Sequence, residues 1–409
     1  MWIANARENL TRMKAFCTKK QIVLRGKKVV NISRKLCSVL SILAVSTGVV
    51  FVSNFASNTL AAEPIKIGVA GAHSGDLASY GLPTARAAEL VVEKINAEGG
   101  LNGTLVELLI EDDVCKPEIA TNTATKLVSA GAKAVIGHIC SGATKAALPI
   151  YDEANVIVMS PSATDSDLTK SGSYPTFYRT IAPNDAQAAS IVNFTVGQLQ
   201  AQKIAIIHDK GDYGKGLAED ARKIIKDGAL ATIVLFEGVT PGAVDYSAVV
   251  QKIKRTRADA VIFGGYHPEA SKIVTQMRKK RMKTLFISDD GVKDDTFVKV
   301  GGKYAEGVYA TGPADVSANP ITRQYRAAYM KKYSVEPGPF FDNAVAAALA
   351  LTNSIRVARS TEMEKIAKML QTQATATPFG DIMFDNHGDA IGVGFSMYVV
   401  KKGEFVQVD

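Results

Sequence analysis

Two short polar stretches of the chain, Cys140-Ser141-Gly142 and Ser162-Ala163-Thr164, have the residue types of a site for a small anion. The segment from Ala134 to Thr164 that contains them has the pattern of a strand, a tight loop, a helix, a second strand and a second loop. Such a βαβ connection brings both loops to the same edge of a parallel sheet. Because free backbone N–H groups at a helix start point toward that edge, the sequence predicts an anion-binding site there.

The three hydroxyl side chains of these loops also have simpler interpretations. Ser141 has the position of an N-cap for a helix beginning at Gly142, and this role is compatible with ligand contact. Ser162 and Thr164 are typical of an ordinary turn after a strand. The spacing alone leaves these alternatives open.

Patterns of other functional classes are absent or incomplete. Gly68, Gly71 and Gly75 do not fit the dinucleotide motif G-x-G-x-x-G, and neither a P-loop nor a G-x-S-x-G nucleophile elbow occurs. No CxxC or HxxxH spacing favours a metal site. The five histidines are scattered and suggest no Ser-His-Asp arrangement: His73, His138, His208, His267 and His387. We therefore expect a protein without catalytic residues, metal or cofactor.

The first 62 residues have the order of a secretory signal peptide. Ten basic residues and one acid, Glu8, precede an apolar run from about Leu36 to Val52, and small residues follow up to Ala61-Ala62. We predict that residues 1–62 are removed near Ala61 or Ala62, with Met13 as an alternative start. The apolar run is shorter than the ~20 residues of a membrane-spanning helix, which disfavours an uncleaved anchor. Cys37 lacks the preceding small residues of a lipid-attachment site.

Removal of this leader changes both the charge and the cysteine count. The remaining chain has 38 basic and 39 acidic residues. The whole-chain net charge of +8 therefore comes from the predicted signal peptide and does not indicate nucleic-acid binding. Cys115 and Cys140 are the cysteines that remain, and in an oxidising compartment we expect them to form a disulfide. Two buried free thiols are the alternative.

Apolar segments of strand and helix length alternate twice along the mature chain, which predicts two α/β domains with parallel-rich sheets flanked by helices. The first series has expected strands at Ile65–Ala70, Leu105–Glu111 and Ala134–Gly137, with helices at Pro83–Ala97 and Pro117–Ala130. The second series begins near Pro183 and has expected strands at Lys203–His208, Thr232–Phe236, Ala260–Gly264 and Thr284–Ser288. Helices at Tyr325–Tyr333, Asn343–Ala358 and Glu362–Gln371 and strands at Gly392–Val400 and Glu404–Val408 follow.

Seven ordered segments resemble those of the periplasmic leucine/isoleucine/valine-binding proteins of bacterial ABC transporters. The resemblance extends from about Glu63 to the end of the chain and is strongest up to Gly312. The segments are IGVAGAHSGDLASYG, INAEGGLNG, EDDVCKP, VIGHICSGAT, SPSATDSDLT, IAIIHDKGDYGKGLA and FGGYHPEASKI.

This resemblance implies a two-lobed periplasmic-binding-protein fold of type I that closes on its ligand by hinge bending. Residues 63–182 and 312–390 would form the N-terminal lobe, and residues 183–311 and 391–409 the C-terminal lobe. The protein would be a periplasmic monomer that binds Leu, Ile or Val between the lobes and delivers it to a membrane permease. A different amino acid, a short amide or a role as a ligand-sensing domain are the alternatives, although a sensor would need a membrane segment after the last strands.

The resemblance also implies roles for individual residues. Ser141 would bind the ligand carboxylate, and Ser162, Ala163 and Thr164 would contact both the carboxylate and the ammonium group. Asp290 stands where the family has a glutamate for the ammonium group, with Asp289 as a rival and a solvated acidic turn as the plain alternative. The pocket for the ligand side chain would comprise Tyr80, Ile139, Cys140, Tyr213, Tyr266 and Phe341.

Overall fold

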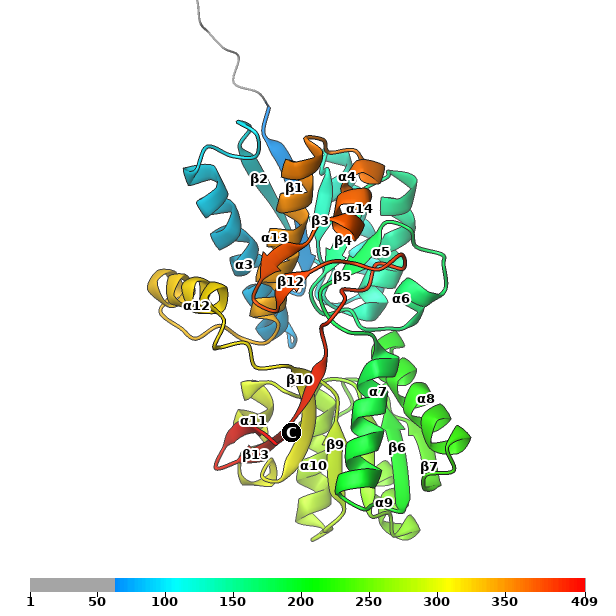
Figure 1. The fold of residues 1–409 in the computed structure, drawn as a ribbon. Coiled ribbons are helices and arrows are strands. Elements are labelled where there is room, and N and C mark those ends of the chain that lie inside the picture. The colour runs from blue at the N-terminus through cyan, green and yellow to red at the C-terminus, as the bar shows by residue number, and fades with distance from the viewer. Residues whose placement is uncertain (1–62, 409) are drawn as a thin grey trace, which may run out of the picture. The chain divides into compact units, whose positions relative to one another are not determined.

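The computed structural model describes residues 63–408, and element labels follow Figure 1. The account below concerns the compact unit that begins at Glu63. The predicted signal peptide lies outside the described residues. Within residues 63–408 no helix has the length and apolar character needed to cross a membrane.

The first sheet has five parallel strands in the order β2-β1-β3-β4-β5. Ile67 of β1 lies opposite both Leu108 of β2 and Ala134 of β3, so the strands end at a common edge. β3 and β4 are buried along their whole length, as expected for central strands of a parallel sheet covered on both faces. The strands are β1 (Ile65–Gly71), β2 (Val106–Asp112), β3 (Ala134–Ile136), β4 (Ile157–Ser160) and β5 (Phe177–Arg179).

Helices cover both faces of this sheet with separate apolar cores. One core joins alternate strand residues such as Ile67 and Ile136 to alanine-rich helix α13, and the other joins Val135 and Val158 to α4 and α5. On the first face lie α3 (Ala78–Ala97), α12 (Pro320–Tyr333), α13 (Phe341–Ala358) and α14 (Met363–Thr372). On the second face lie α4 (Pro117–Ser129) and α5 (Ser141–Glu153), and the short α6 (Asp167–Lys170) follows β4.

The second sheet has seven strands in the order β14-β13-β10-β9-β8-β6-β7, with β13 and β14 antiparallel to their neighbours. The strands are β6 (Lys203–His208), β7 (Thr232–Gly238), β8 (Ala260–Gly264), β9 (Leu285–Ser288), β10 (Val308–Pro313), β13 (Phe395–Lys401) and β14 (Glu404–Gln407). One face packs on α9 (Ser247–Thr256), α10 (His267–Lys279) and α11 (Asp295–Gly301), which a 3-10 turn, Gly302–Tyr304, extends. The other packs on α7 (Asn184–Val192), a π-helical continuation at Asn193–Gln198, and α8 (Asp212–Asp227).

The chain crosses between the two groups of elements three times, after β5, after β10 and before β13 (Figure 1). A two-stranded sheet of β11 (Thr375–Thr377) and β12 (Gly380–Ile382) precedes the last crossing. Most expected elements are present within a few residues of their predicted bounds, but the short β5, β10, β11 and β12 were not expected. The lobe boundaries given above stay a prediction.

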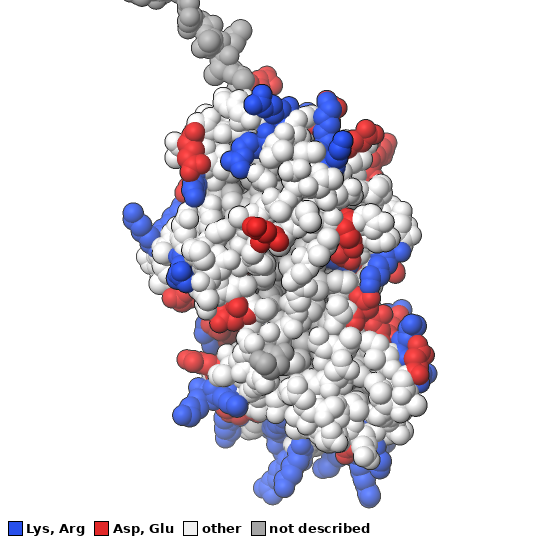
Figure 2. Space-filling view, in the orientation of Figure 1, with Lys and Arg blue, Asp and Glu red and all other residues white. Residues whose placement is uncertain are grey.

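Charged side chains of both signs are spread over the face shown in Figure 2, and lysines and arginines gather at the end where α9 and α10 finish. At the end of α10, the Arg278 guanidinium donates to the carbonyl oxygens of Met282, at 3.1 Å, and Thr284, at 2.9 Å. Lys279 and Lys280 next to it are exposed. Arg278, Lys279 and Lys280 therefore lie at the carbonyl end of α10, where cations are favourable.

Candidate functional site

A cavity lies among residues from both groups of elements. It is at the edges where β1 and β3 of the first sheet and β6 and β8 of the second sheet end. Its empty volume is about 270 Å³, counting the part that is open to solvent. Seven of the sequence-predicted residues line it, together with Gly291 and Phe340: Tyr80, Ile139, Cys140, Ser162, Tyr213, Tyr266 and Asp290. The predicted loops thus meet side chains that are about 50 or more positions away in the chain.

Asp290 supplies the negative charge of the cavity. Its side chain is 2% exposed, Oδ1 accepts a hydrogen bond from the Tyr213 hydroxyl, and Oδ2 is buried without a hydrogen-bond partner. Burial raises the pKa of Asp290 to about 6, although the Tyr213 hydroxyl and the nearby Gln187 amide oppose the shift. A buried carboxylate oxygen without a donor is costly, so this atom indicates a site for a cationic group.

Asp289 is a poorer candidate for the same role because one of its oxygens is already bonded to a backbone donor: Oδ2 accepts from the Gly265 N–H at 2.8 Å. Burial raises the pKa of Asp289 and, to about 7, that of Asp209. Within the described residues no lysine or arginine forms an ion pair with these three carboxyl groups. A cationic ligand group beside Asp290 would stabilise the ionised form of this carboxyl group.

Hydrogen-bond donors lie at the start of α5 and in the loop after β4. The first helical hydrogen bond of α5 runs from the Thr144 N–H to the Cys140 oxygen, so the three preceding N–H groups have no acceptor within the helix. Ser141 Oγ accepts from the Asp165 N–H at 3.1 Å, which leaves its own proton free to donate. Thr164 is fully buried, and its hydroxyl has no partner.

Two of the sequence interpretations for these loops change. The helix begins at Ser141 itself, and its N-cap residue Cys140 makes no side-chain capping bond, so Ser141 is not the N-cap. The Ser162 hydroxyl donates to the Ile139 oxygen at 2.8 Å, and the Ala163 N–H donates to Ser160 Oγ at 2.9 Å. Ser162 and Ala163 therefore fasten the two loops together, and neither the Ser162 hydroxyl proton nor the Ala163 N–H is free for a ligand.

Aromatic rings form a further part of the wall of the cavity. The ring centroid of Tyr266 lies 5.2 Å from that of Tyr213 and 6.2 Å from that of Tyr80. Phe340 completes this wall, and the ring of Phe341 instead packs in the core, 4.9 Å from Tyr329. Phe340 therefore lines the cavity in place of the predicted Phe341. The reason is local: Phe340 takes a left-handed conformation with φ of 60° just before α13, and Phe341 is the first helical residue.

His267 was not expected at the site, yet it contacts a predicted residue directly. The Tyr80 hydroxyl donates to the Gly291 oxygen at 2.8 Å, and His267 Nδ1 lies 2.6 Å from the same hydroxyl. Because a phenol has one proton, Nδ1 of His267 must carry a proton and donate to the Tyr80 oxygen. Tyr80 of α3 is thereby bonded to two residues that belong to the other group of elements.

The predicted disulfide between Cys115 and Cys140 is confirmed, with a Cα–Cα distance of 5.5 Å. Cys140 lines the cavity and immediately precedes α5, whereas Cys115 lies in the turn after β2. The bond therefore ties the wall of the cavity to the neighbouring strand connection.

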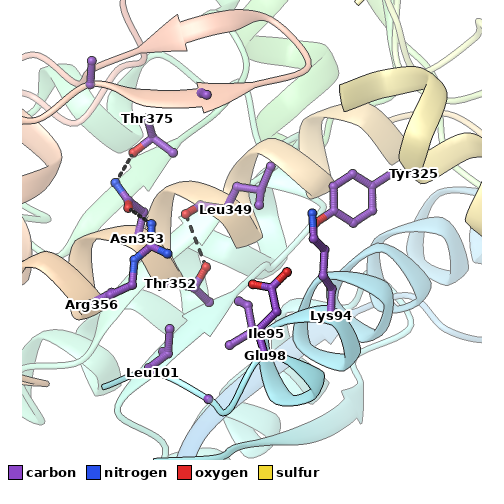
Figure 3. Close-up of a pocket in the computed structure, with 13 residues that line it drawn as sticks. Lys94, Ile95, Glu98, Leu101, Tyr325, Leu349, Thr352, Asn353, Arg356 and Thr375 are labelled. Atoms are coloured by element: carbon purple, nitrogen blue, oxygen red, sulfur yellow. Dashed lines mark hydrogen bonds between the residues drawn. The ribbon is translucent and has the colours of Figure 1, made fainter. Parts of the chain in front are cut away.

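A larger depression lies elsewhere, between the end of α3, the exposed side of α13 and β11 (Figure 3). Its polar groups bond to one another: the Asn353 amide donates to Thr375 Oγ1 at 3.0 Å, and Arg356 donates to Asn353 Oδ1 at 2.7 Å. Lys94 and Glu98 at its rim are exposed. It contains none of the predicted residues, and no unpaired buried polar atom of the described residues lies in it. Size alone therefore does not identify the functional site.

Comparison with known proteins agrees with this geometry. The chain is 33% identical over 347 residues, 85% of this chain and 92% of the relative, to the leucine-, isoleucine-, valine-, threonine-, and alanine-binding protein of Pseudomonas aeruginosa. It is 35% identical over 342 residues, 84% of this chain and 92% of the relative, to the Leu/Ile/Val-binding protein of Escherichia coli K12.

A solved structure shows the same architecture. The branched-chain amino acid transporter substrate binding protein LivJ of Streptococcus pneumoniae, in complex with isoleucine, aligns with a TM-score of 0.74 at 29% identity, over 85% of this chain and all of that one. The predicted α/β fold with two parallel-rich sheets, of the type I periplasmic-binding-protein class, is confirmed. Residues 64–404 match the family described as periplasmic binding protein. The chain belongs to the periplasmic binding protein family.

Proposed function

We propose that the mature protein is the substrate-binding protein of an ABC transporter and binds a neutral branched-chain L-amino acid, leucine, isoleucine or valine. It would deliver this ligand to a membrane permease from the periplasm as a monomer, without a cofactor and without turnover. The names of its relatives support the ligand class, and the order of residues 1–62 supports export.

One observation carries this proposal: the cavity is lined by the Asp290 carboxyl group and, through Cys140 and Ser162, by the two loops in which unpaired hydrogen-bond donors lie, although Ser141 and Thr164 themselves are not lining residues. Asp290 presents a buried, unpaired oxygen, whereas Ser141, Thr164 and the start of α5 present donors without acceptors. An α-amino acid at neutral pH has an ammonium group and a carboxylate attached to the same carbon. Such a zwitterion would satisfy both sides at once, which a simple anion or a simple amine would not.

The wall of the cavity is suited to a neutral aliphatic side chain of the bound amino acid. Tyr80, Tyr266 and Phe340 present ring surface, and Ile139 adds an aliphatic surface. These groups exclude water from an alkyl chain, and the tyrosine hydroxyls of Tyr80 and Tyr213 are already used in bonds to the protein. A charged ligand side chain would find no partner at this wall.

A calorimetric screen of refolded, ligand-free protein tests the proposal. The ligands are the common L-amino acids, D-leucine, and two analogues that lack one charged group, isoamylamine and isocaproate. We expect leucine, isoleucine and valine to bind most tightly and each analogue to bind at least about 100-fold more weakly than leucine, since each leaves one side of the cavity unpaired. Absence of binding by every amino acid would contradict the proposal.

The same screen tests two alternative kinds of ligand. The name of the Pseudomonas relative includes threonine and alanine, so these two amino acids form a second candidate pair. A short amide is the other alternative, and tight binding of acetamide without an amino-acid response would favour it. The unpaired Asp290 oxygen argues against the amide, because an amide has no cation to balance that charge.

The same carboxylate predicts how binding depends on pH. Asp290 in the ligand-free protein has a pKa of about 6, and a bound ammonium group would favour its ionised form. The dissociation constant for leucine should therefore be about tenfold larger at pH 5 than at pH 7 and nearly constant from pH 7 to 8. Titration calorimetry across this range measures it, and an affinity that rises on acidification would contradict the assignment of Asp290.

A further inference from the structure

Arg179, the last residue of β5, is the largest fully buried side chain among the described residues. Its guanidinium uses all three nitrogens. Nη1 donates to the carbonyl oxygens of Ala163, at 3.2 Å, and Asp165, at 2.8 Å. Nη2 donates to Thr169 Oγ1 at 2.5 Å, and Nε donates to Asp389 Oδ1 at 2.5 Å. A rigid fork of donors is suited to fixing several acceptors at once, which a lysine cannot do.

The two carbonyl bonds fix the direction of the peptide groups in the loop after β4. A trans peptide is planar, and its C=O and N–H point in opposite directions. Because the Ala163 oxygen points at Arg179, the N–H of Thr164 points away from it. Within the described residues this N–H has no hydrogen-bond acceptor, and the Thr164 hydroxyl is also unpaired and buried. Arg179 thus holds two unpaired donors of one residue in a fixed orientation.

Asp389 connects the same guanidinium to the crossing segments, the stretches in which the chain passes between the two groups of elements. Arg179 stands directly before the first crossing, and Asp389 stands six residues before β13 at the last crossing. Their backbones also pair: the Arg179 N–H donates to Gly388 at 3.0 Å, and the Ala390 N–H donates to the Arg179 oxygen at 3.2 Å. Thr169 Oγ1 donates to the second Asp389 oxygen at 3.2 Å. The loop after β4 and two crossing segments therefore share one buried ion pair.

We propose that Arg179, paired with Asp389, is a positioning residue that aims the Thr164 donors at the ligand carboxylate and ties this loop to the crossing segments about which the two lobes turn. This inference rests on the proposed amino-acid function. Ser162 of the same loop lines the cavity, whereas Thr164 and Arg179 do not, so Arg179 acts only through the loop that it holds. The buried guanidinium also polarises the Ala163–Thr164 peptide, which strengthens the Thr164 N–H as a donor to an anion.

Arg179→Lys tests the inference because it keeps a cation beside Asp389 but removes the fork that holds two carbonyl oxygens. Arg326→Lys is the matched control, since Arg326 pairs with Asp342 between α12 and α13 and contacts no residue of the cavity. If Arg179→Lys does not fold, the double variant Arg179→Gln/Asp389→Asn removes both charges and tests the same contacts.

Two measurements are needed for each variant. Calorimetry with leucine should show a dissociation constant about 10- to 100-fold larger for Arg179→Lys, and less than twofold larger for Arg326→Lys. Amide hydrogen exchange of the ligand-free protein should be faster in Arg179→Lys at Ala163 and Asp165, whose N–H groups bond to Ser160 and Ser141.

The outcomes separate this inference from the proposed function. If the wild type binds leucine and Arg179→Lys binds it equally well, Arg179 does not position the loop for the ligand and the inference is overturned, while the function stands. If the wild type binds no amino acid, the proposed function fails. Hydrogen exchange then decides alone: faster exchange supports the fixing of the loop by Arg179, and unchanged exchange overturns it.

Discussion

Replacement of Asp290 by asparagine should weaken the binding of leucine by about 100- to 1,000-fold, equivalent to about 3–4 kcal/mol. The side chain keeps its shape and an acceptor for the Tyr213 hydroxyl, so the change removes charge more than structure. The ligand ammonium group would then be buried without a counter-charge, which is the costly case of a broken ion pair. Titration calorimetry against leucine at pH 7.5 measures the loss.

Two further acids make this prediction specific. Asp294→Asn is a matched control, because Asp294 is also buried with an unpaired Oδ2 but caps α11 through the Thr296 N–H, and we expect it to leave affinity unchanged. Asp289→Asn tests the rival acid, and we expect a loss of stability at the Gly265 turn with little loss of affinity. A larger affinity loss in Asp289→Asn than in Asp290→Asn would transfer the ammonium role to Asp289.

The same substitution should have the opposite effect on the ligand-free protein. The folded pKa of Asp290, about 6, lies above its ordinary value of 3.8, so the folded state holds the proton more tightly than the unfolded state. Stability therefore falls as pH rises from about 4 to about 6, and a cost of about 3 kcal/mol persists above that range. Ligand-free Asp290→Asn should melt at a higher temperature than the wild type at pH 8, and the difference should close toward pH 4.

Removal of the disulfide should lower the free energy of unfolding by about 3–4 kcal/mol. The bond joins residues that are 25 positions apart, and a crosslink of that span restricts the unfolded chain by about this amount. The variant is the double substitution Cys115→Ser and Cys140→Ser in the mature chain, measured by urea denaturation. A double substitution avoids an unpaired thiol.

Reduction of the wild-type protein provides the control for this measurement. Dithiothreitol should lower the unfolding midpoint of the wild type to that of the double variant and should leave the double variant unchanged, because residues 63–409 contain no other cysteine. Equal unfolding free energies for the oxidised wild type and the double variant would show that the crosslink contributes no stability.

The residues at the ends of strands were the most predictable part of the site. A buried apolar strand that ends in glycine or small polar residues places the next side chains at a sheet edge, and Ser162 follows this rule, whereas Tyr213 and Tyr266 were predicted from the family resemblance. Asp290 follows β9 in the same way, but its sequence context did not distinguish it from Asp289. The distinction came from which carboxylate oxygens were already bonded, which depends on Gly265, 24 positions before Asp289.

Other parts of the site could not be predicted because they depend on tertiary contacts. Arg179 lies in a strand of three residues, too short for an alternation pattern, and its partners are residues 163–169 and Asp389. The ring of Phe340 faces the cavity only because the residue takes a left-handed conformation that no local motif requires. His267 belonged to no recognisable motif, and its bond to Tyr80 joins residues 187 positions apart.

The discontinuous strand order also governs when this chain becomes able to fold. The core of the first sheet needs α13, residues 341–358, and the second sheet ends with β13 and β14, residues 395–407. A chain that emerges from its N-terminus therefore lacks essential parts of both cores until its final segments have appeared. Strands such as β10 and β13, paired across more than 80 intervening residues, also form slowly because such distant pairing has a high loop-closure entropy. The topology thus predicts late compaction, which is compatible with the export that we propose.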